Sequence, residues 1–93
     1  MSGQTDRVRV VAQWVQRAES DLRNAEHTLT MGEDCPYDTV CFHAQQCAEK
    51  YLKALLTFLS IDFPKIHDIA ELSALLPSHL RPSLSVEEQE RLT

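Results

Sequence analysis

Residues 37–59, YDTVCFHAQQCAEKYLKALLTFL, contain neither proline nor glycine and decide the fold. Apolar side chains recur through this segment at intervals of three and four residues, which is typical of an α-helix. Because they spread over roughly half of the helix circumference, we expect burial of this helix on two sides. The apolar set comprises Val40, Cys41, Ala44, Cys47, Ala48, Tyr51, Leu52, Leu55, Phe58 and Leu59.

The remaining arc of this helix, roughly 120° wide, is polar. It carries His43, Gln46, Glu49, Lys50 and Lys53, with Phe42 among them. Two lysine charges with directional hydrogen bonds from an imidazole and an amide can hold a phosphate, so we select His43, Gln46, Lys50 and Lys53 as ligand-binding residues. The alternative interpretation is an ordinary i,i+4 ion pair between Glu49 and Lys53, with Lys50 lying over apolar surface.

Residues 6–31 also lack proline and glycine and predict a second long, amphipathic helix, antiparallel to the first. Thr5 or Asp6 would cap its start, and Gly32 can take the left-handed conformation that ends a helix. Residues 33–36 predict the turn between the two helices. The expected apolar stripe is Val8, Val11, Val15, Ala18, Leu22, Ala25 and Leu29.

A third, shorter helix is predicted after the Phe63-Pro64 pair, because the residue before a proline disfavours helix. Asp68 and Glu71 have the spacing of a capping box, which places the helix start at residue 69. Pro77 would stop it. Its expected apolar face is Ile69, Leu72, Leu75 and Leu76.

Lys65 and His67 precede this third helix and complete the candidate ligand-binding set. Backbone N–H groups at a helix start favour an anion, and Lys65 adds positive charge nearby. The alternative is that His67 acts only as a structural hydrogen-bond donor. His43, His67 and Glu71 match no short metal-ligand motif, so we predict no metal, no cofactor and no catalytic residue.

The length of 93 residues restricts the protein to one small domain, residues 1–93. With 43% hydrophobic and 25% charged residues, a disordered chain or a loop-rich disulfide scaffold is excluded. Ser85 and Glu88 predict a fourth helix from Val86, and the few residues left for it suggest a domain whose last helix is missing or cut short. At this size a single copy has a small core, so we expect a homodimer.

Charge and cysteine usage narrow the possible partners. A net charge of −5 disfavours non-specific binding to nucleic acid. Three cysteines six residues apart fit neither paired disulfides nor a zinc site, so we expect a reducing, cytoplasmic location, with Cys41 and Cys47 as small core residues. No stretch is apolar enough to span a membrane. Trp14 and Phe42 lie beside the apolar stripes and are expected to be exposed on a partner surface.

Three stretches of the chain together resemble the HEPN domain family. They are the run Tyr37 to Leu56, the segment Ala18-Glu19-Ser20-Asp21-Leu22 before it, and the segment Phe63-Pro64-Lys65-Ile66-His67-Asp68-Ile69 after it. The resemblance covers about residues 18–76. It implies an up-and-down helical bundle, related to four-helix bundles, that commonly dimerises. It further implies nucleotide or RNA binding, or partnership with a minimal nucleotidyltransferase, often in a toxin–antitoxin or defence system.

The chain departs from this family in one respect. HEPN ribonucleases carry an arginine followed after four to six residues by a histidine, late in the domain. Arg23 and His27 are separated by only three residues and lie in the first predicted helix, so the motif is not carried over to them. We therefore favour a binding module over an enzyme, the alternative being a metal-independent ribonuclease toxin whose motif lies beyond residue 93.

Overall fold

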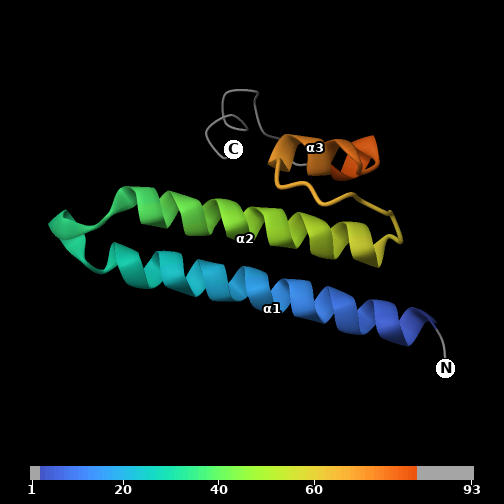
Figure 1. Ribbon diagram of the computed structural model, residues 1–93, viewed down its shortest axis with the longest axis horizontal. Helices are drawn as coiled ribbons and strands as arrows, with labels where there is room; N and C mark the ends of the chain where they lie inside the picture. Colours follow the sequence, from blue (N-terminus) through green and yellow to red (C-terminus); the bar gives the residue numbers. More distant parts are fainter. Residues whose placement is uncertain (1–2, 82–93) are drawn as a thin grey trace.

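Two long antiparallel helices form the body of the molecule, of which the computed structural model describes residues 3–81. Its elements are α1 (Gly3–Leu29), a short 3-10 turn η1 (Gly32–Asp34), α2 (Tyr37–Phe58), α3 (Ile69–Ala74) and a second 3-10 turn η2 (Ser78–Leu80). α1 lies along one side of α2, and α3 lies on the other side (Figure 1). The described residues are all helical or connecting, which confirms the predicted all-α class. The fourth helix predicted from Val86 lies outside the described residues.

The turn between α1 and α2 follows the residues that predicted it. Gly32 adopts a φ of 67°, a left-handed conformation that costs other residues energy. Pro36 directly precedes α2, and its carbonyl oxygen accepts from Thr39 N at 2.9 Å. The expected cap at Thr5 or Asp6 was wrong, because α1 already includes both residues.

The seam between α1 and α2 repeats every seven residues, as in an antiparallel coiled coil. On both helices its residues are small, polar or aromatic rather than large and aliphatic, and Ala18, Ala25, Cys47 and Ala54 are buried there. The seam is formed by Val11, Trp14, Ala18, Asp21 and Ala25 of α1 and by Val40, His43, Cys47, Lys50 and Ala54 of α2.

The predicted stripe of α1 is therefore only half correct. Val11, Ala18 and Ala25 lie in the seam, whereas Val8, Leu22 and Leu29 are exposed. The stripe combined two neighbouring rows of the helix, only one of which faces α2. Cys47 is buried as predicted, but the prediction for Cys41 was wrong because its side chain is exposed.

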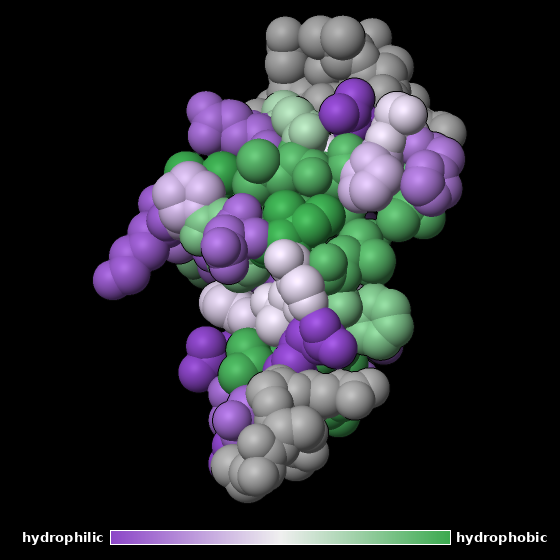
Figure 2. Space-filling view, turned by 90° about the vertical axis from the view of Figure 1, so that its right-hand side faces the viewer, coloured by the Kyte–Doolittle hydropathy of each residue, from purple (hydrophilic) through white to green (hydrophobic). Residues whose placement is uncertain are grey.

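The apolar core lies between α2 and α3. It consists of buried residues of α2, of α3 and of the segment just after α3, surrounded by partly buried residues of α2 and of the loop between the two helices. The buried residues are Leu52, Leu56, Ile69, Leu72 and Leu76. Figure 2, which looks at the end of the molecule where α2 turns toward α3, shows hydrophobic side chains gathered near the middle of that end.

The third helix begins as expected and ends early. The Asp68 carboxylate accepts from Glu71 N at 3.1 Å and caps it. The helix ends at Ala74, so Leu75 is partly exposed although Leu76 still reaches the core. Among the described residues, no helix combines the length and hydropathy required to cross a membrane.

Candidate ligand-binding site

A buried carboxylate of α1 holds two of the predicted site residues. Asp21 is 8% exposed, and its Oδ1 lies 3.0 Å from Nδ1 of His43. Its Oδ2 accepts from Nζ of Lys50. Burial opposes ionisation of Asp21, but the hydrogen bonds and charges of Lys50 and His43 outweigh it and hold its pKa below the ordinary value. The side chains of His43 and Lys50 are therefore directed into the seam, where both contact Asp21.

A second buried carboxylate, that of Glu49, contacts two other residues of the predicted site, Lys53 and His67. Glu49 is only 2% exposed, and its Oε2 lies 2.9 Å from Nδ1 of His67 and 3.4 Å from Nζ of Lys53. Its other oxygen, Oε1, has no hydrogen-bond partner among the described residues. Because a carboxylate only accepts, Nδ1 of His67 must carry the proton it donates.

His67 is oriented but accessible. Its side chain is 75% exposed, although one ring nitrogen is held by the buried Glu49. With Nδ1 engaged in this way, Nε2 is the ring atom left for an external partner. Lys65 is exposed two residues earlier, so a flexible cation accompanies a fixed imidazole.

An aromatic ring with two cations adjoins this carboxylate–histidine pair. The Arg17 guanidinium and the Lys53 ammonium each lie 5.3 Å from the centroid of Trp14, within cation–π range. The Trp14 ring also packs against Phe63, with 6.4 Å between centroids. Trp14 is thus half-buried, and the prediction of an exposed aromatic was wrong for it, whereas Phe42 is exposed as predicted.

The predicted polar arc is divided into two clusters. His43 and Lys50 pair with Asp21, while Lys53 pairs with Glu49, and none of these three side chains is fully exposed. Gln46 is half-buried. The i,i+4 contact between Glu49 and Lys53 agrees with the alternative interpretation of that pair, whereas Lys50 lies against Asp21 rather than over apolar surface.

Sequence reasoning gave little weight to Asp21, Glu49, Arg17 and Trp14. A signal for two of them was present: Trp14, Ala18, Asp21 and Ala25 follow each other at steps of four, three and four residues, which is the seam spacing. Asp21 therefore occupies a position that normally holds an apolar residue. No such pattern indicates Arg17, because its position depends on the orientation of the Trp14 ring.

The structure also bears on the start of α3 and on the histidines considered for a metal site. At the start of α3, the Asp68 carboxylate accepts from the backbone N–H of Glu71, so one of the free N–H groups of this helix end is already bonded. His43 and His67 pair with different carboxylates, and residues 3–81 contain no group of three or more metal-ligating side chains.

Comparison with known proteins places the chain in a family. The family model described as HEPN domain matches residues 11–93, which is most of the chain. No curated protein and no solved structure gives a significant match. The two long antiparallel helices and the third helix after them agree with the all-helical fold of that family. The chain belongs to the HEPN domain family.

Proposed function

We propose that this HEPN domain binds a nucleotide or RNA through a phosphate group, at the surface formed by His67, Lys65 and Arg17. The observation that carries the proposal is the contact between the exposed His67 and the buried Glu49. A surface histidine without a ligand gains little from such a fixed orientation, whereas a binding residue benefits because less side-chain entropy is lost on binding.

Charge supports an anionic ligand at this surface although the chain as a whole is acidic. The buried Lys53, 5% exposed, offsets the charge of the Glu49 carboxylate, while Arg17 and Lys65 are exposed and can form hydrogen bonds with a phosphate. His43, Gln46 and Lys50 would act indirectly, since His43 and Lys50 hold α2 against α1 through Asp21.

The Trp14 ring favours a nucleotide over inorganic phosphate. Bases stack on aromatic rings, and arginine beside such a ring commonly contacts the phosphate of the same nucleotide. Trp14 is only half-buried, so part of this residue reaches solvent beside Arg17. We assign to this HEPN domain a role beside a minimal nucleotidyltransferase, in a toxin–antitoxin or defence type system of the cytoplasm.

The chain contains a single tryptophan, so the site has its own fluorescent reporter. We would titrate the purified protein with ATP and, separately, with a single-stranded RNA oligonucleotide while recording Trp14 emission. A saturable change is expected for at least one of them. The double variant Lys65→Ala/His67→Ala should weaken binding at least about tenfold, since a hydrogen bond to a charged group contributes about 1.5–3 kcal/mol.

The matched control is Arg23→Ala, which removes an exposed positive charge of α1 on a different face from Arg17. It should bind like the unaltered chain, whereas Arg17→Ala should weaken binding. Equal affinity of the unaltered chain and the folded double variant would contradict the proposal, as would an absence of binding. Cleavage of the RNA would instead identify a ribonuclease, and a nucleotidyltransferase complex indifferent to ATP would identify a structural adaptor.

A further inference from the structure

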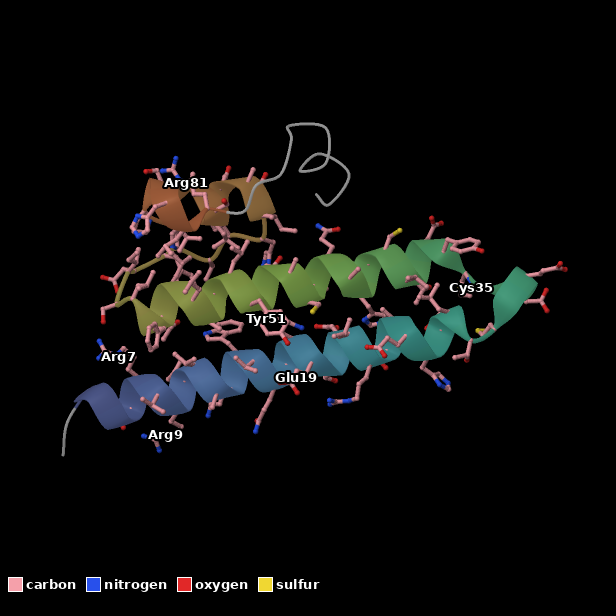
Figure 3. The ribbon with its side chains drawn as sticks, turned by 180° about the vertical axis from the view of Figure 1, so that it is seen from behind. Arg7, Arg9, Glu19, Cys35, Tyr51 and Arg81 are labelled. Atoms are coloured by element: carbon pink, nitrogen blue, oxygen red, sulfur yellow. The ribbon has the colours of Figure 1, made fainter. Side chains whose placement is uncertain are left out.

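The exposed imidazole of His67 is backed by the buried carboxylate of Glu49. The loop between α2 and α3 runs back along α2, on which Figure 3 labels Tyr51, and apolar residues of the loop pack against that helix. This return brings Nδ1 of His67 to 2.9 Å from Oε2 of Glu49. Because Nδ1 carries the proton of that contact, Nε2 of the neutral ring holds a lone pair, on a side chain that is 75% exposed. An imidazole held in this way has the geometry of a nucleophile.

The Glu49 carboxylate can accommodate a positive charge on this ring. Its contact with Nζ of Lys53 measures 3.4 Å, longer than the about 2.7–2.9 Å of a strong charge-assisted hydrogen bond, whereas its contact with His67 is 2.9 Å. Its Oε1 has no hydrogen-bond partner among the described residues, although Glu49 is only 2% exposed. The negative charge of Glu49 is therefore only partly compensated. It would stabilise the ring of His67 when a covalent bond at Nε2 makes that ring cationic.

The chain contains four histidines, which differ in exposure and in contact with a carboxylate. His43 also has a carboxylate on Nδ1, that of Asp21, but its side chain is only 24% exposed. His27 and His79 are exposed, and no carboxylate of residues 3–81 bonds to either ring. Within the part of the chain that the structure describes, His67 is thus the one histidine that combines both properties.

We propose that His67 accepts a phosphoryl group on Nε2 from a donor that contains a P–N bond, such as phosphoramidate or the phosphohistidine of another protein. The Nε2 lone pair attacks phosphorus and forms a new P–N bond, while the P–N bond of the donor breaks and leaves its electron pair on the donor nitrogen. Nδ1 keeps its proton, which stays hydrogen-bonded to Glu49. This covalent step goes beyond the proposed function, which requires only reversible binding at the same histidine.

The surroundings of His67 are compatible with a bound phosphoryl group, which brings about two negative charges. Lys65 is exposed two residues earlier and supplies a flexible cation. Asp68 follows His67 directly, but its carboxylate accepts from the backbone N of Glu71 at 3.1 Å and is therefore directed to the start of α3. The exposure of the ring also leaves the group accessible to a second acceptor, as a carrier of phosphoryl groups requires.

The test is phosphorylation of the full 93-residue chain by phosphoramidate, a small donor that carries no base and releases ammonia. Mass spectrometry should detect an added phosphoryl group that is lost in acid and kept in alkali, as is typical of phosphohistidine. Peptide mapping at early times should show His67 labelled at least about tenfold faster than His27 and His79, which are exposed but lack the carboxylate. This comparison is made within one folded chain. Equal labelling of the three histidines, or no labelling, would overturn the inference.

Variants then test the part played by Glu49, which acts as a positioning residue. Glu49→Gln keeps the size of the side chain and removes its charge, so labelling of His67 should slow at least about tenfold. Labelling of His27 and His79 should not change, whereas a general loss of structure would alter all three. Unchanged labelling of His67 would contradict the role of Glu49. His67→Gln should lose the early label, and the matched control His79→Gln should keep it.

The outcome is separable from that of the binding proposal. Phosphoramidate carries no base, so labelling of His67 in a chain whose Trp14 emission does not respond to ATP or RNA would support phosphoryl transfer and contradict only the proposed function. A chain that binds ATP or RNA but is not labelled at His67 would overturn only the phosphoryl transfer.

Discussion

Asp21 of α1 and Lys50 of α2 form an ion pair inside the seam between the two long helices. The seam is otherwise built largely from small and apolar side chains, so this pair and the adjoining His43 are its main polar contacts. A buried pair of this kind contributes little compared with apolar packing, but removing one partner leaves the other charge without compensation. The sensitivity of the fold to Asp21 follows from that asymmetry.

Replacing Asp21 with alanine should lower the free energy of unfolding by about 3 kcal/mol, because Lys50 would keep its charge in a half-buried position without a carboxylate. Urea unfolding followed by circular dichroism measures this. Glu19→Ala, which removes an exposed carboxylate from the same helix, should stay within about 0.5 kcal/mol of the unaltered chain. Equal stability of the two variants would show that the pair carries no such role.

The contribution of Asp21 should also depend on pH. Its pKa lies below the ordinary value of 3.8 in the folded protein, so folding favours the ionised form. The stabilisation is present at pH values above 3.8 and is lost as the pH falls through the lower folded-state pKa. The stability difference between the unaltered chain and Asp21→Asn should therefore shrink as the pH falls into the acid range. A difference that stays constant into strong acid would contradict this.

Leu72→Ala should cost about 2–5 kcal/mol of stability, since Leu72 is wholly buried in the core between α2 and α3. That is a large fraction of the total for a small domain. Leu75, on the same turn but 37% exposed, supplies the matched control. Thermal or urea unfolding should place Leu75→Ala clearly closer to the unaltered chain, and the reverse order would contradict the packing of α3 described above.

Gly32→Ala should destabilise the protein by about 1 kcal/mol, because alanine resists the left-handed conformation required there. Steric crowding is not the cause, as a Cβ at this position would meet no atom within 4 Å. Gly32→Asn should cost less, because asparagine tolerates that conformation better. Comparison of the two unfolding midpoints tests the assignment, and an asparagine variant less stable than the alanine variant would refute it.

The start of α2 and the turn before it could be read from the sequence because Gly32 and Pro36 mark them. Residues 37–59 predicted a helix that the structure ends at Phe58, and Asp68 caps α3 as its spacing indicated. Which face of each helix is buried was harder to predict. Apolar residues on α1 fill both the seam row and the neighbouring exposed row, and a charged residue, Asp21, occupies the seam.

The candidate site was only partly predictable for a related reason. Lys53 and His67 lie far apart in the sequence and come together through Glu49, whose burial depends on how α2 and the loop before α3 pack. Periodicity along one helix cannot show which residues from a loop will reach it. His67 and Lys65 were nevertheless selected, because they precede a helix start that the sequence does mark.

The single buried charge of α1 also determines how the two helices align. A seam of small side chains repeating every seven residues would fit nearly as well if α1 slid along α2 by two turns. Such a shift would separate Asp21 from His43 or Lys50 and place the carboxylate against an uncharged neighbour. The ion pair thus selects one register among several of similar packing, much as a lone polar residue does in a coiled coil.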